Sequence, residues 1–158
     1  MADEKTNVMR ILDQKKISYV PHCHAYSGGP VDGPHVAALI GMEPDKAFKT
    51  LVTQGSSGEH YVFVVPVMKN LDLKAAARAV GEKNIQLIKL SELLPLTGYV
   101  HGGCSPVGMK KAFPTVIDES ARSLETMACS AGKIGRQVEL SPQALADLIG
   151  ASFAPVSK

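Results

Sequence analysis

The sequence predicts an α+β fold in which a mixed, mostly antiparallel sheet is surrounded by helices. Helical and strand-like segments follow one another without strict β–α–β alternation, and the C-terminal half contains short apolar runs separated by turns, a pattern typical of hairpins. The 158 residues contain no internal repeat, low-complexity tract or linker. We therefore expect a single domain over residues 1–158, long enough to bury roughly two-thirds of the surface of the unfolded chain.

The first half of the chain is expected to contain two helices and three strands. Apolar side chains at helical spacing follow Thr6, a suitable N-cap, and a second helix begins near Pro34, because proline fits the first helical turn. We expect Pro21 to end the first strand, and Gly55–Gly58 to close a hairpin between the other two. In chain order, the expected elements are a helix at 7–16, a strand at 17–20, a loop at 26–34, a helix at 34–41, and strands at 46–53 and 60–65.

The second half is expected to combine short helices with apolar strands. Asp72, Ser91 and Ser141 are N-cap candidates, and we expect Pro95 to cut short the helix that Ser91 begins. The segment 132–135 reads as a tight turn between the last two strands. In chain order, the expected elements are a helix at 72–81, a strand at 84–88, a helix from 91 to 95, strands at 115–118, 124–130 and 137–140, and a helix at 141–150.

Composition excludes several classes of protein. The apolar runs reach strand length but not the ~20 residues of a membrane span, and the polar segment Met1–Thr6 lacks the apolar core of a secretion signal. We therefore expect a cytoplasmic protein with no membrane contact. Three irregularly spaced cysteines argue against a disulfide framework. A net charge of +2 with scattered lysines is too small to indicate a dedicated nucleic-acid binder, so any RNA contact must be modest or supported by a partner.

The first candidate functional residue is Lys49, which lies within the apolar strand Phe48–Leu51. If Phe48 and Thr50 face one side of the sheet, Lys49 faces the other, between alanine and leucine. Such a lysine is either an edge residue whose ammonium reaches solvent, or it lines a cavity. In a cavity, desolvation would lower its pKa, and it could act as a base or remain charged and hold an oxyanion or phosphate.

The second candidate is the glycine-rich segment Gly102–Gly108. Its three glycines and one proline would let the backbone approach a ligand closely and direct N–H groups at developing negative charge. The alternative is an ordinary turn between strands. The segment lacks the spacing of a P-loop, and so does 132–136, for which a hairpin turn with solvated charges is the plain interpretation.

Metal binding and cysteine catalysis find little support in the sequence. His22, Cys23 and His24 are adjacent, but no second pair of ligands follows at the spacing of a zinc site, although His101 and Cys104 are conceivable partners. No signature selects a cysteine–histidine pair. We therefore expect neither a metal nor a cofactor.

Several blocks of sequence, in their order and spacing, resemble the YbaK family of bacterial editing proteins, the Cys-tRNA(Pro) deacylases. Two positions depart from the family pattern: Ala131 stands where a second glycine is common, and His24 stands where a tyrosine is often found beside the pocket. The matching blocks are Asn7–Val8, Phe48–Leu51, Asn70–Ala76, Thr97–Tyr99, Gly102–Lys111, Thr115–Asp118, Glu125–Thr126, Ser130–Gly135 and the final helix.

The resemblance implies a partly closed mixed sheet wrapped by helices, with a pocket between Lys49 and the glycine-rich segment. It implies removal of cysteine that prolyl-tRNA synthetase has wrongly attached to tRNA(Pro), with Cys-tRNA(Cys) as a further substrate. In this family the thiol of the substrate attacks the ester and leaves a thiolactone, so no protein nucleophile is required. The implied partners are the aminoacyl-tRNA and prolyl-tRNA synthetase. The implied catalytic residues are Lys49 and Gly103, and the implied substrate-binding residues are His24, Phe48, Thr50, Gly102, Ser105, Pro106, Gly108, Ser130 and Gly132.

Three alternatives stay open at the level of sequence. The first is removal of alanine, or another small residue, from tRNA(Pro) with water as the nucleophile. The second is a non-catalytic module that binds an amino acid or an aminoacyl adenosine and regulates a partner. The third, more distant, is hydrolysis of an acyl thioester.

Overall fold

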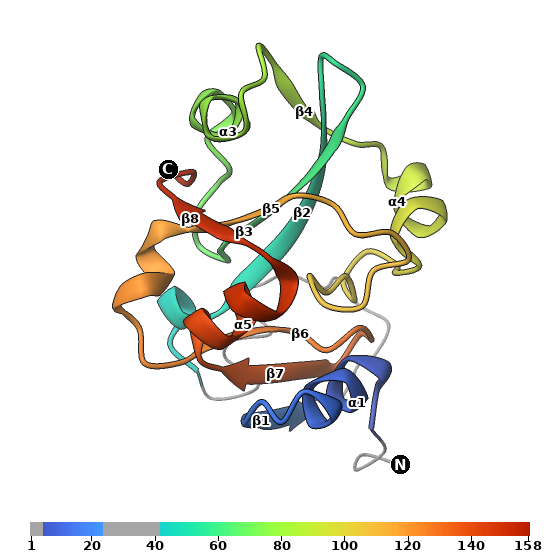
Figure 1. Ribbon diagram of the computed structural model, residues 1–158, viewed down its shortest axis with the longest axis vertical. Helices are drawn as coiled ribbons and strands as arrows, with labels where there is room; N and C mark the ends of the chain where they lie inside the picture. The colour runs from blue at the N-terminus through green and yellow to red at the C-terminus, as the bar shows by residue number, and fades with distance from the viewer. Residues whose placement is uncertain (1–4, 24–41) are drawn as a thin grey trace.

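The computed structural model describes residues 5–23 and 42–158 (Figure 1). The loop expected at 26–34, the helix expected at 34–41 and His24 lie outside this part of the chain. The described helices are α1 (Asn7–Gln14), α3 (Leu73–Val80), α4 (Leu90–Thr97) and α5 (Pro142–Ile149), with short 3₁₀ turns at η1 (Pro44–Lys46) and η2 (Glu119–Ser123). The described strands are β1 (Tyr19–Cys23), β2 (Phe48–Gly55), β3 (His60–Pro66), β4 (Ile85–Leu87), β5 (Thr115–Asp118), β6 (Met127–Ser130), β7 (Arg136–Leu140) and β8 (Ser152–Ala154).

The strands form two sheets that meet at one point. A three-stranded antiparallel sheet has the order β1-β7-β6, and a five-stranded mixed sheet has the order β4-β2-β3-β5-β8. In the larger sheet β5 runs parallel to both β3 and β8. A parallel bridge between Ala47 and Ala128 joins the sheets where β2 begins beside β6. The helices lie around the outside (Figure 1). The expected α+β architecture with a partly closed, mixed sheet is confirmed.

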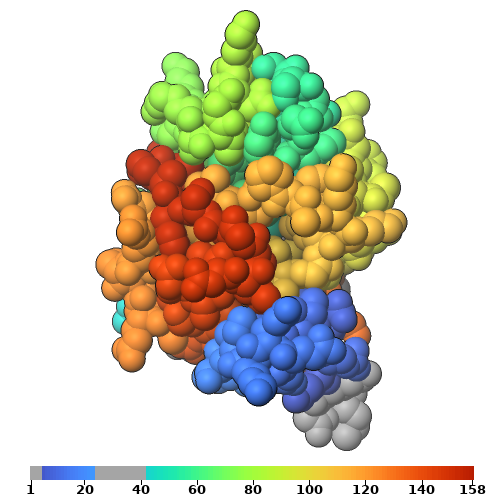
Figure 2. All heavy atoms as spheres, viewed as in Figure 1, coloured from blue at the N-terminus to red at the C-terminus, as the bar shows by residue number. Residues whose placement is uncertain are grey.

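The main core lies between the two sheets and is covered by α1 and α5. Figure 2 shows these two helices packed side by side on one face of the molecule, α1 in blue and α5 in red. A second apolar cluster lies beneath α3, on the opposite face of β2 and β3. Members of the main core include Val8 and Leu12 of α1, Phe48 and Val64 of β2 and β3, Met127 and Cys129 of β6, Val138 and Leu140 of β7, and Leu145 of α5.

Local chemistry begins three helices, α1, α3 and α5, at the predicted N-caps. The Thr6 hydroxyl accepts a hydrogen bond from the Met9 N–H, and the Asp72 and Ser141 side chains accept from N–H groups three residues further on. Glycines in the left-handed conformation end α3 and α5. Among the described residues, none of the helices has the length and apolar character that a membrane crossing requires.

Two proline predictions were wrong: Pro21 does not end β1, and Pro95 does not end α4. Strand β1 continues through Pro21 to Cys23, because β1 is an edge strand that pairs only with β7 and one missing N–H is tolerated there. Helix α4 is capped at Lys89 rather than Ser91, since Glu92 accepts a hydrogen bond from the Lys89 N–H at 3.0 Å, and the helix continues past Pro95. Pro95 removes one hydrogen bond of this short helix without ending it.

The C-terminal strands also differ from expectation. Only β6 and β7 form a hairpin there, because β5 is inserted between β3 and β8 by long crossover connections. Strand β8 was not predicted, since its three residues are too short to show a period. Strand β2 begins at Phe48 rather than Lys46, because η1 occupies the preceding residues.

Candidate active site

Strand β2 holds Lys49 on the face of the sheet turned away from the main core. Its neighbour Phe48 is 4% exposed and packs in that core, whereas Leu51, on the same face as Lys49, packs against the cluster beneath α3. Lys49 pairs with Val65 of β3, and its side chain is half-buried. Desolvation by burial lowers the pKa of the Lys49 ammonium. The two ion pairs of the described residues do not include it.

From the register at the junction of the sheets, we infer that Lys49 lies level with polar side chains of three other strands. Extending the Ala47–Ala128 register by two residues on each parallel strand brings Lys49 level with Ser130. Ser130 pairs with Gln137 of β7, and Gln137 pairs with His22 of β1. Cys129 of β6 and Val138 of β7, which alternate with Ser130 and Gln137, pack in the main core. The side chains of Lys49, Ser130, Gln137 and His22 therefore lie on the face turned away from that core. We call Lys49, Ser130, Gln137 and His22 the polar row.

A fixed carboxylate lies beside one end of the polar row. Glu139, two residues along β7 from Gln137, accepts a hydrogen bond from the Thr126 hydroxyl and lies 2.9 Å from Nε2 of His22. The hydrogen bonds from Thr126 and His22 hold the pKa of the Glu139 carboxyl below its usual value. The row therefore has a cation at the Lys49 end and an anion near the His22 end. This arrangement suits a substrate that carries both a carbonyl oxygen and an amino group.

Gly103 rests on the turn that follows Ser130. A Cβ placed on Gly103 would lie 3.0 Å from the Ile134 amide nitrogen and 3.2 Å from the Lys133 carbonyl carbon, so a side chain there would push the backbone of the turn away by a few tenths of an ångström. The Gly103 N–H donates to the Val100 carbonyl at 3.0 Å. Gly103 therefore contributes close backbone approach rather than a free N–H group, and it brings the glycine-rich segment against the end of the β6–β7 hairpin.

The remainder of the glycine-rich segment is built into the fold. Gly102 has φ +89°, a conformation that favours glycine. The fully buried Ser105 hydroxyl accepts a hydrogen bond from the Val107 N–H at 3.2 Å, and Pro106 is buried beside it. Gly108 has φ +75° and leaves no space for a Cβ, which would lie 3.0 Å from both Ile11 and the Tyr99 hydroxyl. The structure thus buries Ser105 and Pro106 in the fold and sets Gly108 against Tyr99 and α1.

Two other predicted residues lie on the core side of the sheet. The Phe48 ring packs in the main core, and the hydroxyl oxygen of Thr50 is buried without a hydrogen-bond partner among the described residues. Their side chains therefore face away from Lys49. Gly132, in contrast, follows the polar row directly: its N–H donates to the Ser130 hydroxyl at 3.1 Å, and it packs against Tyr99. Substrate binding by Phe48, Thr50 and Gly132 stays a prediction, as does that by His24.

None of the three cysteine thiols is placed and activated to act as a nucleophile at the polar row. Burial raises the pKa of the Cys104 thiol to about 12 and that of the Cys129 thiol to about 12, so both are protonated at neutral pH. Cys23 is exposed and alternates with His22, so it faces away from the row. Within residues 5–23 and 42–158, no three side chains of His, Cys, Asp or Glu gather as metal ligands do.

A separate hollow of about 420 Å³ lies away from the polar row. The β2–β3 hairpin, β4 and the start of α4 form it, and its lining includes Gln54, Asn84, Gln86 and Glu92. None of the residues of the polar row lines it. We therefore assign it no part in the candidate site.

Sequence reasoning missed His22, Gln137 and Glu139 as members of one site. The alternation of Gln137 and Glu139 with Val138 and Leu140 indicates their common face, but the sequence does not reveal that β7 lies between β1 and β6. Only the strand order brings residues 22, 137, 130 and 49 together.

Comparison with known proteins identifies the family. Residues 34–148 match the aminoacyl-tRNA editing domain, well over half of the chain. The chain belongs to the aminoacyl-tRNA editing domain family. Its activity is therefore aminoacyl-tRNA editing, the removal of an amino acid from a wrongly charged tRNA, and the family expected from the sequence blocks is confirmed.

Two sequence relatives and one solved structure illustrate the relationship. A protein of Enterococcus faecalis, provisionally named the Cys-tRNA(Pro)/Cys-tRNA(Cys) deacylase EbsC, is 42% identical over 154 residues, covering 98% of this chain and 94% of the relative. A proline–tRNA ligase of Pelobacter propionicus is 28% identical over 98 residues, covering 62% of this chain and 17% of the ligase. A crystal structure provisionally described as a trans-editing enzyme for prolyl-tRNA synthetase matches with a TM-score of 0.82 and 25% identity, covering 98% of this chain and 99% of that one.

Proposed function

We propose that this editing protein removes cysteine from tRNA(Pro), with Cys-tRNA(Cys) as a second substrate. The observation that carries the proposal is a half-buried lysine that forms no ion pair with a described residue, on a strand that a parallel bridge joins to β6, where the described residues supply no activated nucleophile. A site of this kind suits a substrate that brings its own nucleophile. The name of the Enterococcus relative, which is 42% identical to this chain, supports the same substrate.

In the proposed reaction the thiol of the attached cysteine attacks its own ester. The sulfur forms a bond to the carbonyl carbon, the bond from that carbon to the ribose oxygen breaks, and the thiol proton ends on the ribose oxygen. The products are tRNA with a free ribose hydroxyl and cysteine as a cyclic thiolactone, which water then opens. Because nucleophile and ester belong to one molecule, the effective concentration of the thiol is high once the protein holds the reactive conformation.

In this proposal the chain supplies positioning and charge. The Lys49 ammonium stabilises the oxyanion that develops on the carbonyl, where the half-buried setting strengthens the interaction relative to water. The opposite end of the polar row, near Glu139, receives the α-amino group. Gly103 keeps the site narrow by holding its segment against the β6–β7 turn.

Removal of cysteine from tRNA(Pro) corrects an error that the selectivity of a synthetase pocket cannot prevent. A synthetase pocket shaped for proline cannot strongly reject cysteine, because small apolar differences are worth only about 1–3 kcal/mol. A second site that requires a thiol removes the error by chemistry rather than by size.

The test is single-turnover deacylation of Cys-, Ser- and Ala-tRNA(Pro) by the purified protein. We expect rapid loss of cysteine and little loss of serine or alanine, because a hydroxyl is a poorer nucleophile than a thiol and alanine has none. Faster release of alanine than of cysteine would establish water as the nucleophile and overturn the proposal. Binding without any deacylation would identify a regulatory module instead.

We further propose that prolyl-tRNA synthetase is the partner that selects tRNA(Pro). The similarity of this chain to a segment of a proline–tRNA ligase supports an association with that enzyme. The measurement is the ratio of deacylation rates for Cys-tRNA(Pro) and Cys-tRNA(Cys), with and without the synthetase. We expect similar rates in isolation and a preference for tRNA(Pro) when the synthetase is present; a strong preference by the isolated protein would contradict this partner role.

A further inference from the structure

Positive charge is unevenly distributed along the chain. No carboxylate occurs between Glu92 and Asp118, a stretch that contains the glycine-rich segment and the lysine pair Lys110-Lys111. None occurs between Glu125 and Glu139 either, a stretch that contains the β6–β7 turn with Lys133. The net charge of +2 conceals this local excess, because carboxylates elsewhere in the chain offset it.

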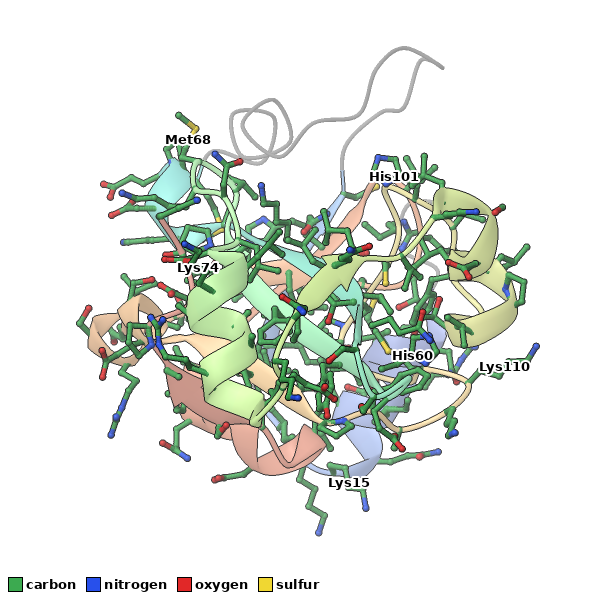
Figure 3. The ribbon with its side chains drawn as sticks, turned by 90° about the horizontal axis from the view of Figure 1, so that it is seen from above. Lys15, His60, Met68, Lys74, His101 and Lys110 are labelled. Carbon is green, nitrogen blue, oxygen red and sulfur yellow. The ribbon has the colours of Figure 1, made fainter. Side chains whose placement is uncertain are left out.

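The fold brings these two basic stretches into contact. Gly103 packs against the backbone of Lys133 and Ile134, so the start of the glycine-rich segment adjoins the turn that follows Ser130. Lys110 lies two residues past the end of the glycine-rich segment, and its N–H donates to the Thr97 carbonyl at 2.9 Å. Figure 3 shows Lys110 pointing outward near α4, on the side of the molecule that also carries His101 and opposite Lys74.

Three lysine side chains of these two stretches are exposed and can bind an anion. Lys110, Lys111 and Lys133 are exposed, and neither ion pair among the described residues includes them. The Lys111 ammonium lies 5.8 Å from the centroid of the Phe113 ring, a contact that orients the side chain without neutralising its charge. We call Lys110, Lys111 and Lys133 the basic rim.

We propose that the basic rim binds phosphates of the tRNA acceptor stem while the aminoacylated 3′ end occupies the Lys49 site. This inference rests on the proposed function. The single-stranded 3′ end must pass over the rim of the site, so the duplex that precedes it comes to lie against the surface that adjoins Gly103. Double-stranded RNA presents its phosphates at regular positions and is contacted mainly through shape and backbone, which exposed lysines can do without reading sequence.

The number of lysines sets the strength and character of this contact. Each phosphate neutralised contributes a slope of roughly 0.9 to the dependence of log affinity on log salt concentration, by analogy with duplex DNA. Three lysines therefore give weak binding that salt reduces steeply. Contacts to the backbone do not distinguish tRNA(Pro) from tRNA(Cys), in agreement with the equal rates proposed for the isolated protein.

The first experiment measures binding of a deacylated acceptor-stem minihelix by fluorescence anisotropy across a series of KCl concentrations. The test variant is Lys110→Ala/Lys111→Ala, and the matched control is Lys69→Ala/Lys74→Ala, which removes the same charge from exposed positions outside the basic rim. We expect the test variant to lower the salt slope by about 2 and to raise Kd on the order of tenfold near physiological salt. Equal slopes for the test variant and the wild type, or the same change in the control, would overturn the proposal.

The second experiment separates this surface from the chemistry. Wild type and both variants are compared on Cys-tRNA(Pro) and on a cysteinylated CCA trinucleotide, which lacks the stem. We expect the test variant to raise KM for the full tRNA with little change in kcat, and to process the trinucleotide like the wild type. An equal loss on the trinucleotide would place the lysines in the reaction site and refute the docking surface. If the wild type deacylates neither substrate, the proposed function fails, and the minihelix titration still decides whether the rim binds RNA.

Discussion

At the scale of single residues, the charge of Lys49 dominates the candidate site. The ammonium is partly removed from water, and the described residues provide no carboxylate to pair with it. Burial of this kind destabilises the charged form in the free protein, and an oxyanion of the transition state relieves that cost. We therefore expect Lys49 to matter much more for catalysis than for folding.

Replacing Lys49 with alanine should lower the single-turnover deacylation rate by about 10²–10³, the loss typical of a missing oxyanion donor. Thermal unfolding should change little, because the side chain is only half-buried and makes no ion pair with a described residue. Lys74→Ala on α3 is the matched control and should leave the rate unchanged. A Lys49→Ala variant that keeps more than about a third of the wild-type rate would show that the lysine serves no catalytic purpose.

The pH dependence of the rate distinguishes a cation from a base at position 49. If the protonated form stabilises the oxyanion, activity is present below the pKa of Lys49 and is lost as pH rises through it. Burial lowers that pKa, so the loss begins at lower pH than for a free lysine. Lys49→Arg should move the falling limb to higher pH, since a guanidinium stays charged. A wild-type rate that keeps rising through that range, with Lys49→Arg inactive at every pH, would instead identify Lys49 as a base.

At the scale of elements, the glycine-rich segment acts through its shape. Gly103 donates its N–H to Val100, and its missing side chain permits contact with the β6–β7 turn. The other end of the segment is anchored separately, because the Tyr99 hydroxyl donates to the Val107 carbonyl and Gly108 lies against Tyr99 and α1. The glycine-rich segment therefore sets the distance between itself and the β6–β7 turn.

Gly103→Val should separate the segment from the turn and lower kcat/KM, on the order of the 10²-fold effects that follow small displacements in active sites. The smaller change Gly103→Ala should have the same sign and a smaller size. Gly58→Ala at the β2–β3 hairpin is the control for stability: its φ of +94° strains any side chain, but a Cβ there meets nothing within 4 Å, so its effect on the rate reports loss of stability away from the site. Normal turnover by a folded Gly103→Val variant would exclude the segment from the reaction site.

The end of β5 ties down the C-terminal residues through one buried carboxylate. Asp118 accepts hydrogen bonds from the Val156 and Ser157 N–H groups, each at 3.0 Å, and from the N–H and hydroxyl of Ser120. Burial alone would raise the pKa of Asp118, but these hydrogen bonds outweigh it, and the pKa lies below the ordinary value. The carboxylate therefore stabilises the fold above the unfolded-state pKa, and this contribution is lost as pH falls through the folded-state pKa.

Asp118→Asn should lower the free energy of unfolding at pH 7 by about 1–3 kcal/mol, because a charged acceptor is replaced by a neutral amide. Between pH 7 and pH 3 the stability of the variant should fall less than that of the wild type. Denaturant titrations at several pH values measure both effects. Parallel stability curves for the two proteins would show that the charge of Asp118 contributes nothing.

At the scale of the whole molecule, the features that could be predicted from the sequence are those that depend on a few neighbouring residues. The caps at Thr6, Asp72 and Ser141 depend on one side chain and an N–H three residues away, so each could be predicted from a few residues. Pro21 was misjudged because its tolerance depends on β1 lying at an edge, which is a property of the sheet. Only part of the candidate site could be predicted, for the same reason. The alternation of side chains along a strand predicts which face of the sheet carries Lys49, but its neighbours depend on the order of the strands.

The bridge between Ala47 and Ala128 has a consequence for how substitutions act at a distance. Both residues are almost fully buried and small, which lets two separately built sheets approach each other at one place. Lys49 belongs to one sheet, whereas Ser130, Gln137 and His22 belong to the other. We therefore expect a bulkier residue at either alanine to change the angle between the two sheets. Lys49 would then move away from Ser130, Gln137 and His22, while each sheet kept its own hydrogen bonds.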